Sequence, residues 1–348
     1  MVPPLRRHVL HAHLRTWRPY TLWYIGLVGL AGAGVTAGRH DWWRLVAAWA
    51  TPTIGWIGGH YLSDYFDRNL DAISKPHRPI PSGQLSPRAA LICGIVCLAG
   101  VGGLSIAGSW YAVLIAVLAA ASIVAYGRGL KARGLAGNVV RGALGTLTLL
   151  YGAAMVAAPA QWTLVPFVLT FWAHDISSNL VGTLRDVTGD RAGGYRTVPV
   201  RHGIRVAVLT ALAWYCVALL AATLGGWTVE HQPARTAYLV ALVPAVALGL
   251  AAFRSLLAQQ HRLSMRTALR AHELLVLERV WLAATVVGLG LGMTLAGLLL
   301  APALAMTWWT QSNLRAGYEF GPASTGGTRV PTEEAAVRRS PHQPSTPD

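Results

Sequence analysis

The sequence predicts an all-α membrane protein: a polytopic helix bundle of about nine transmembrane helices, with two Asp-rich helix–loop motifs on its cytoplasmic side. Three observations support this fold class: low charge, long apolar runs and an uneven distribution of basic residues. The 348-residue chain is 53% hydrophobic and only 12% charged, with a mean hydropathy of +0.43. Soluble domains carry roughly 25% charged residues, so this composition excludes an ordinary soluble domain.

The apolar runs set the expected elements and their order. Each run is close to the roughly 20 residues that a helix needs to cross a bilayer. In chain order the runs cover 20–38, 45–62, 88–107, 109–126, 139–158, 161–182, 204–226, 236–254 and 279–304. The expected organisation is a cytoplasmic N-terminal segment at 1–19, a transmembrane domain at 20–310 and a disordered tail at 311–348, which is rich in Pro, Ser, Thr and Gly.

The basic residues indicate how the chain sits in the membrane. The net charge of +15 is compatible with a nucleic-acid partner. However, 22 of the 29 basic residues lie in segments that are cytoplasmic if the N-terminus is inside. The external loops hold only Arg39, Arg44 and Arg235. This asymmetry follows the positive-inside rule, so we expect a multi-pass cell-membrane protein, a lipid bilayer as partner and no nucleic acid. Usage of 27 Arg against 2 Lys suggests a GC-rich, bacterial genome.

Two clusters of Asp stand out, because the whole chain has only fourteen acidic residues. Asp64, Asp67 and Asp71 follow the second apolar run at helical spacings i, i+3 and i+7, and Asp186 and Asp190 follow the sixth at i and i+4. Each cluster therefore projects from one helix face, where like charges repel. Carboxylates suit Mg²⁺, which binds a few of them together with substrate phosphates. Solvated helix ends with Arg partners are the alternative.

The two clusters belong to an internal repeat. Asp67 and Asp71 are followed by Arg78-x₂-Pro81, and Asp186 and Asp190 by Arg196-x₂-Pro199, at offsets of 119, 119, 118 and 118 residues. Such a repeat predicts two similar helix–loop units that face each other across a cavity. Opposed Asp pairs trailed by Arg would form a clamp for a diphosphate and its metal ions, since Arg contacts phosphate oxygens in bidentate fashion.

These residues resemble the UbiA superfamily of intramembrane prenyltransferases. Its first motif, Asn-Asp-x-x-Asp-x-x-x-Asp followed by Lys-Pro-x-Arg-Pro-x-x-Ser-Gly, is similar to 63–71 and 75–83. Its second, Asp-x-x-x-Asp followed by Gly-x-(Arg/Lys)-Thr-x-Pro-Val, is similar to 186–190 and 194–200. Weaker matches are Arg18-Pro19-Tyr20-Thr21-Leu22, Tyr126, Lys131 and Gly137-Asn138.

Two positions depart from the family pattern. Ser63 stands where the family has Asn, and Thr183 stands where many members carry a further Asp. One metal ion would then have fewer protein ligands than usual, or a water in their place. The Asp pair of each motif is kept.

The resemblance implies a role for each candidate residue. The metal ligands would be Asp64, Asp67, Asp71, Asp186 and Asp190, and the cofactor would be Mg²⁺. Substrate-binding residues would be Ser63, Lys75, Arg78, Lys131, Asn138, Asn179 and Arg196. Tyr126 would stabilise a carbocation with its ring face, although an interfacial aromatic without a chemical role is the alternative. The site would face the cytoplasm.

The sequence does not decide the roles of the polar residues inside the sixth apolar run. Asn179 lies seven residues before Asp186 on the same helical face, where it would either serve the site or make a helix–helix hydrogen bond. His174 and Asp175 would contact the acceptor or pair with each other, and the same choice applies to His60.

We therefore expect Mg²⁺-dependent transfer of a prenyl group from a prenyl diphosphate to an aromatic or quinone-precursor acceptor. A terpene cyclase, which ionises the same donor without an acceptor, is the runner-up. A membrane transporter is the alternative from another class, because repeats and intramembrane polar residues occur there too. It predicts charges near the bilayer midplane, whereas the Asp clusters lie at helix ends.

Overall fold

The computed structural model describes residues 4–228 and 232–321, in which every regular element is a helix. The long helices are α2 (Leu22–Val35), α3 (Trp42–Ser74), α4 (Pro87–Gly108), α5 (Trp110–Arg128), α6 (Leu135–Val156), α7 (Val165–Leu184), α10 (Ile204–Gly225), α11 (Gln232–Gln259), α12 (Met265–Leu291) and α13 (Met293–Thr310). The remaining α-helices are α1 (Pro4–Trp17), α8 (Val187–Ala192), α9 (Val198–His202) and α14 (Ala316–Phe320). The all-α prediction is confirmed.

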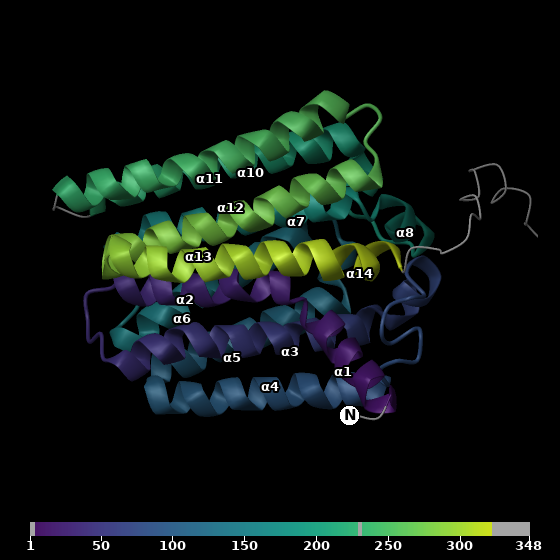
Figure 1. The fold of residues 1–348 in the computed structure, drawn as a ribbon, viewed down its shortest axis with the longest axis horizontal. Coiled ribbons are helices and arrows are strands. Elements are labelled where there is room, and N and C mark those ends of the chain that lie inside the picture. The colour runs from purple at the N-terminus through teal and green to yellow at the C-terminus, as the bar shows by residue number, and fades with distance from the viewer. Residues whose placement is uncertain (1–3, 229–231, 322–348) are drawn as a thin grey trace, which may run out of the picture.

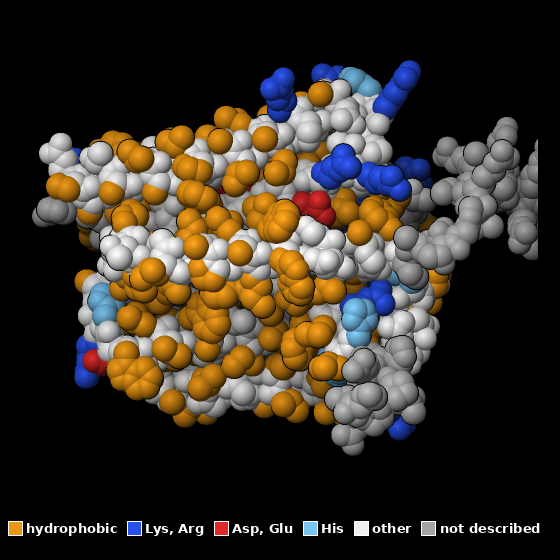
Figure 2. Space-filling model, viewed as in Figure 1, with side chains coloured by type: hydrophobic (Ala, Val, Ile, Leu, Met, Phe, Trp, Pro, Cys, Tyr) orange, Lys and Arg blue, Asp and Glu red, His pale blue; other side chains and the backbone are white. Residues whose placement is uncertain are grey.

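The long helices run side by side along one direction, and α8 and α14 lie together at one end of the bundle (Figure 1). Among the described residues, seven helices are long and apolar enough to cross a membrane. Hydrophobic side chains cover the long side of the bundle, and the Lys and Arg side chains visible in Figure 2 gather mostly towards the α8–α14 end. This is the surface of a multi-pass membrane protein.

The last predicted span, 279–304, is wrong as a single helix. Gly292 has φ +98°, ends α12 and precedes α13. Only glycine adopts this backbone conformation readily, so a mostly apolar run can contain a helix break that hydropathy does not reveal. The predicted count of nine spans is therefore not confirmed.

The predicted start of a disordered tail at 311 also needs correction. A π-helical turn covers Gln311–Arg315, and α14 follows it directly to Phe320. Arg315, Tyr318 and Glu319 are buried at 1%, 1% and 7% exposure, so this segment packs into the fold. Residues 322–348, the rest of the predicted tail, lie outside the described residues.

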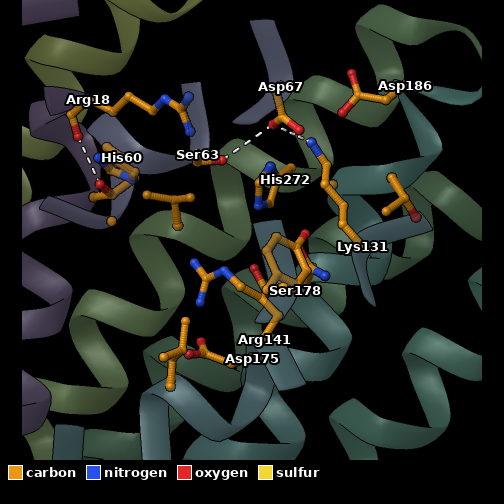
Figure 3. Close-up of a pocket in the computed structure, with 18 of the residues that line it drawn as sticks. Arg18, His60, Ser63, Asp67, Lys131, Arg141, Asp175, Ser178, Asp186 and His272 are labelled. Atoms are coloured by element: carbon orange, nitrogen blue, oxygen red, sulfur yellow. Dashed lines mark hydrogen bonds and ion pairs between the residues drawn. The ribbon is translucent and has the colours of Figure 1, made fainter. Parts of the chain in front are cut away.

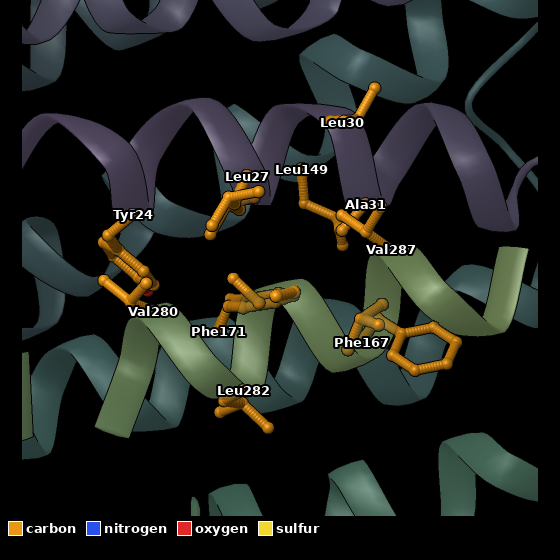
Figure 4. Packing of buried hydrophobic residues seen from close by; sticks show 14 of the residues in the cluster. Tyr24, Leu27, Leu30, Ala31, Leu149, Phe167, Phe171, Val280, Leu282 and Val287 are labelled. Atoms are coloured by element: carbon orange, nitrogen blue, oxygen red, sulfur yellow. The ribbon is translucent and has the colours of Figure 1, made fainter. Parts of the chain in front are cut away.

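Helix α2 packs against α3, α6 and α12 at the centre of the bundle. Leu27 and Ala31 of α2 face Leu149 of α6 and Val280 and Val287 of α12 in the main core (Figure 4). Glycines allow the α2 and α6 backbones to touch: a Cβ on Gly152 would lie 1.7 Å from the Gly29 carbonyl oxygen. Small residues at such crossings are typical of helix packing in membranes.

Helix α3 continues twelve residues past the predicted apolar run and so carries the first Asp cluster. It ends at Ser74, where Lys75 precedes Pro76 and leaves helical geometry with φ −145° and ψ 60°. Steric clash with a following proline disfavours the α conformation, which accounts for the stop. The cluster thus occupies the last turns of a continuous helix.

Candidate active site

A cavity of about 210 Å³ opens among helices α3, α6, α7 and α12 near the α8–α14 end. Its lining includes most of the predicted site residues: Ser63, Asp67, Arg78, Tyr126, Lys131, Asn179, Asp186 and Asp190. Other lining residues come from the segment before α2, from α12 and from the segment after α13. Residues far apart in sequence therefore share one pocket.

The first Asp cluster lies on one face of α3, as its spacing predicts. Asp64, Asp67 and Asp71 are 3%, 3% and 4% exposed, so these are buried charges rather than solvated helix ends. Arg78 donates to both carboxylate oxygens of Asp71 at 2.9 Å. Lys131 donates to Oδ2 of Asp67 at 2.6 Å.

The second cluster is arranged differently from the prediction of a single helix end. Helix α7 ends at Leu184, and Asp186 is the N-cap of the separate short helix α8, which contains Asp190. The i, i+4 relation survives, because the Asp190 N–H donates to the Asp186 carbonyl at 2.8 Å. Asp186 and Asp190 therefore both face the cavity.

The pKa values of the two carboxyl groups of this second cluster are shifted in opposite directions. Burial alone would raise the pKa of Asp186, but Lys75 and Arg185 beside it hold its pKa below the ordinary value. Burial, and then the nearby Asp186 charge, raise the pKa of Asp190 to about 6. Although burial opposes it, the Asp67 carboxylate holds the pKa of Lys131 above its usual value.

Lys75 joins the two motifs. Its ammonium group lies 2.7 Å from Asp186 Oδ1 and thereby bridges the first loop to the second cluster. Asp67, Lys131 and Asp186 lie around the same part of the cavity in Figure 3. The two units thus face each other across a cavity, as the internal repeat predicts.

Five predicted residues are absent from the cavity lining. Asp64, Asp71 and Lys75 form ion pairs with residues of the lining, whereas Arg196 and Asn138 lie elsewhere. The Arg196 side chain is exposed and is absent from the cavity lining, whereas its repeat partner Arg78 is buried there. Asn138 is 3% exposed inside α6 and also lies outside the lining. Their substrate-binding roles stay predictions that the cavity lining does not support.

The departures from the family pattern have visible consequences. Ser63 donates a hydrogen bond to Asp67 Oδ2 at 3.3 Å, so the hydroxyl still orients that carboxylate. Thr183 lines the cavity but donates to the Leu180 carbonyl of its own helix at 2.7 Å. The Thr183 position therefore supplies no carboxylate to the cavity.

Sequence reasoning missed the contribution of α14. Glu319 lies 2.8 Å from Lys75, 3.5 Å from Arg78 and 3.3 Å from Arg185. The Tyr318 hydroxyl donates to Asp64 at 2.9 Å, and the Arg78 guanidinium lies 4.4 Å from the Tyr318 ring centre. A carboxylate from the C-terminal segment therefore occupies the cation cluster predicted for phosphate.

Arg18 closes the cavity from the N-terminal side in an unusual backbone conformation. Its φ of 50° and ψ of 65° are left-handed, which costs a non-glycine residue roughly 1–2 kcal/mol. Its guanidinium bonds to Asp64 and to the Tyr318 hydroxyl, and its carbonyl accepts from the Thr21 side chain at 2.9 Å. These bonds hold the strained residue against the first Asp cluster.

Of the two alternatives for His174 and Asp175, pairing with each other is wrong, and contact with the acceptor stays a prediction. His174 bonds to Glu278 of α12 rather than to Asp175. Asp175 accepts from the Tyr24 hydroxyl at 2.8 Å and lines the cavity. His60 also lines it, with Nδ1 2.8 Å from the Trp17 carbonyl oxygen.

An apolar groove continues from the cavity. It is bordered by α3, α4, α5 and α6, and it shares Trp56, Ile123 and Leu144 with the cavity lining. Small side chains such as Ala116 and Ala119 line it farther along. A polar cavity therefore leads into an apolar channel within the bundle.

The carboxylates fit magnesium if substrate supplies the remaining ligands. Among residues 4–228 and 232–321, no three Asp, Glu, His or Cys side chains converge as a ready-made metal site. Mg²⁺ usually binds through one or two carboxylates, phosphate oxygens and water. Asp67 Oδ1 is buried without a hydrogen-bond partner in the described part of the chain, as expected of a carboxylate that awaits a cation.

Comparison with known proteins agrees with this geometry. The model of the UbiA prenyltransferase family matches residues 22–275. Relatives named digeranylgeranylglyceryl phosphate synthase, from Natronomonas pharaonis and Methanopyrus kandleri, are both 34% identical to this chain. The alignments cover 68% of this chain in each case, and 83% and 90% of the relatives.

Solved structures show the same fold. A UbiA homolog from Archaeoglobus fulgidus bound to GPP and Mg²⁺ has a TM-score of 0.63 at 14% identity, over 86% of this chain and 99% of that one. The apo structure of a UbiA homolog from Aeropyrum pernix K1 has a TM-score of 0.64 at 16% identity, over 76% and 96%. At these identities the likeness shows the fold alone. The organisms named here are archaeal, and the bacterial source stays a prediction.

Proposed function

The chain belongs to the UbiA prenyltransferase family and transfers a prenyl group to an acceptor, and on this premise we propose the donor, the metal and the acceptor. The donor is a prenyl diphosphate, the cofactor is Mg²⁺, and the acceptor is the free hydroxyl of a prenylated glyceryl phosphate. The observation that carries the donor assignment is the convergence of Asp67, Asp186 and Asp190 with Arg78 and Lys131 on one cavity.

The diphosphate would lie among the cations that now pair with carboxylates. Lys75, Arg78 and Lys131 are available to phosphate oxygens once Glu319 and the Asp side chains take other partners. Asp67, Asp186 and Asp190 would hold Mg²⁺, which when bound would link them to the diphosphate and neutralise its charge. Charge on the leaving group is stabilised most where donors and cations are fixed in advance.

The prenyl chain would lie in the apolar groove between α3, α4, α5 and α6. This groove joins the cavity at Trp56, Ile123 and Leu144, so the first carbon of the chain would sit near Tyr126. An aromatic ring face there stabilises positive charge on carbon. The surrounding helices keep water away from the carbocation.

Prenyl transfer breaks one bond, forms another and releases a proton, for which the cavity offers a base. The bond between the first prenyl carbon and the diphosphate oxygen breaks, and the electron pair leaves with the diphosphate. The acceptor oxygen bonds to that carbon, and its proton goes to a base. His60 fits this role: its Nδ1 faces a carbonyl and must carry the ring hydrogen, which leaves Nε2 as the proton acceptor.

The acceptor assignment replaces the expected aromatic compound. Relatives at 34% identity bear a name that describes a glyceryl phosphate with two geranylgeranyl groups. A hydroxyl acceptor needs a base for its proton, and His60 offers one beside the cavity. The same relatives are named as synthases, which favours transfer over cyclisation and over transport.

Product analysis tests the proposal. Purified enzyme with Mg²⁺ would be incubated with diphosphates of three chain lengths, and with a geranylgeranyl glyceryl phosphate, a hydroxybenzoate or no acceptor. The expected product is the doubly prenylated glyceryl phosphate. Prenylated hydroxybenzoate would overturn the acceptor assignment, and a cyclic hydrocarbon formed without acceptor would overturn transfer.

The orientation of the site is part of the proposal. The end of the bundle that carries α8 and α14 also carries most of the basic side chains visible in Figure 2. By the positive-inside rule this end would face the cytoplasm, where diphosphates are made. Chemical labelling of a cysteine introduced at exposed Arg196, from each side of sealed vesicles, would test it.

A further inference from the structure

The inner end of the cavity contains two arginines that the donor site does not use. Arg141 comes from α6 and Arg279 from α12, and both line the cavity. In Figure 3, Arg141 lies with Ser178 and Asp175 on the side away from Asp67 and Asp186. These residues form a second polar patch in the same pocket.

These two arginines have fewer partners than the other cations of the cavity. Arg279 is 5% exposed and Arg141 is half-buried, and neither guanidinium has a carboxylate within 4 Å or a hydrogen bond to another described residue. Asp175 is the one carboxylate of the patch, so two guanidinium groups share a single negative charge. The side-chain hydroxyl of Ser178, which is 2% exposed, also lacks a partner among the described residues. Burying excess charge of one sign is unfavourable, so the second positive charge of the patch favours binding of an anion.

The other cavity cations differ in this respect. Lys131 and Arg78 each contact an Asp within 3 Å, and Arg185 contacts Glu319 at 3.3 Å. Arg315 has no carboxylate partner either, but it donates to Gln311 and His272 at 2.5 Å. Of these six, only Arg141 and Arg279 have neither an ion pair nor a side-chain hydrogen bond to another described residue.

Aromatic rings hold both guanidinium groups in place. Arg141 lies 4.1 Å from the Trp56 ring centre, and Arg279 lies 4.5 Å from that of Tyr24. The Tyr24 hydroxyl donates to Asp175, so its ring is itself anchored. Stacked arginines keep their N–H groups free for an oxyanion and are fixed before it arrives.

The patch lies at the right depth for the second substrate. Trp56, over which Arg141 stacks, precedes Asp67 on α3 by eleven residues, which is about 16 Å of helix. The Trp56 level is therefore about 16 Å inward from Asp67. An anion held there would place the rest of its molecule between the arginines and the diphosphate.

We propose that Arg141, Arg279 and Ser178 form a subsite for the phosphate of the acceptor. The proposal rests on the function given above and adds how the acceptor is recognised. A phosphate bound between the two guanidiniums would turn the neighbouring hydroxyl of the acceptor outward, towards Tyr126 and the first carbon of the donor. His60, on the same side of the cavity as Trp56, would face that hydroxyl.

Acceptor kinetics test the subsite. The acceptors are geranylgeranyl glyceryl phosphate and the same alcohol without its phosphate. For Arg279→Gln and Arg141→Gln we expect KM for the phosphate acceptor to rise about tenfold to a hundredfold, the range expected for lost charge-assisted hydrogen bonds. KM for the neutral alcohol and for the donor should change less than twofold. Arg279→Lys should fall between wild type and Arg279→Gln.

The matched control is Arg270→Gln, an exposed arginine on the same helix, which should change none of these constants. Equal changes in KM for the phosphate acceptor and the neutral alcohol, or no change for either, would overturn the subsite. Melting temperatures of all variants in detergent identify any that fail to fold.

Direct binding separates this proposal from the proposed function. If the wild-type enzyme uses neither glyceryl acceptor, the acceptor assignment fails, and calorimetric titration with glycerol phosphate then decides the subsite alone. Binding to wild type but not to Arg279→Gln would support an anion subsite. Equal binding to both proteins, or binding to neither, would overturn it.

Discussion

Asp190 differs from its neighbour Asp186 in the direction of its pKa shift. Its pKa is raised to about 6 by burial and by Asp186, and it accepts a hydrogen bond from Thr197 at 3.2 Å. Asp186, four residues earlier, is kept charged by Lys75 and Arg185. A neighbouring negative charge raises the pKa of a carboxyl, and a cation bound beside both groups would relieve this repulsion.

Magnesium binding should therefore depend on pH through Asp190. The raised pKa means that this carboxyl is mostly protonated at pH 5 and mostly charged at pH 7, and only the charged form binds Mg²⁺. We expect Mg²⁺ affinity, measured by calorimetry with a non-hydrolysable prenyl diphosphate analogue, to fall up to about tenfold per unit below pH 6. Asp190→Asn should bind more weakly and with a flatter profile. Constant affinity of the wild type from pH 5 to 7.5 would contradict this account.

At the scale of helices, α5 and α14 each contribute to the surroundings of the site. Helix α5 borders the apolar groove, and α14 places Glu319 among the cations that are predicted to bind phosphate. The apolar sequence of α5 is consistent with its place beside the apolar groove. The contact of α14 with the site could not be predicted, because 244 residues separate Glu319 from Lys75. Glu319 also lies after the last apolar span, in a stretch that reads as the start of a polar tail.

The width of the groove at α5 should set the donor length. Ala119 lines the groove one turn before Ile123, where groove and cavity join. We expect Ala119→Phe to block the groove and to reduce kcat/KM for a 20-carbon donor by more than tenfold, with little effect on a 10-carbon donor. Ala121→Phe, on the exposed face of the same helix, is the control and should leave both values unchanged. Parallel losses for both donors would argue against the groove as the prenyl site.

Glu319 should compete with the donor for its cations. It contacts Lys75, Arg78 and Arg185, so its removal leaves these cations without one carboxylate partner. We expect Glu319→Gln to bind inorganic diphosphate about tenfold more tightly and to melt at a lower temperature without ligand. Calorimetry and thermal unfolding would measure both. Weaker diphosphate binding in this variant would show that Glu319 supports the site rather than competes.

At the scale of the whole molecule, close crossings of small residues hold the helices that carry the site. Helix α2 contacts α6 through Gly29, Gly32 and Gly152, and a Cβ at Gly32 would lie 1.9 Å from the Leu149 carbonyl oxygen. These crossings place Tyr24 of α2 beside the cavity residues of α7 and α12. The geometry of the site therefore depends on packing several turns away.

A larger side chain at this crossing should disrupt the fold. Gly152→Val would push α2 and α6 apart, and overpacking of this kind destabilises by about 1–3 kcal/mol or more. We expect a lower melting temperature in detergent and loss of activity. Gly103→Val, on α4 with open space around the added Cβ, is the control and should melt like wild type. Equal stability of the two variants would contradict a tight α2–α6 contact.

The sequence predicted the membrane class, the single face of Asp64, Asp67 and Asp71, and the opposition of the two motifs. It could not predict the break at Gly292. Glycines are common throughout the apolar runs, and hydropathy does not indicate which of them has a positive φ. The two copies of the repeat also differ: Arg78 is buried beside Asp71, while Arg196 is exposed. Which copy keeps its contact depends on tertiary packing.

The central claim is that the two Asp motifs together release diphosphate from a prenyl donor. The most direct measurement is Mg²⁺-dependent release of diphosphate by purified Asp67→Ala and Asp190→Ala, with Asp41→Ala at the other end of α3 as the control. The account predicts a loss of about a hundredfold or more for each of the first two variants and none for the control. Release at the wild-type rate by Asp67→Ala and Asp190→Ala would contradict it.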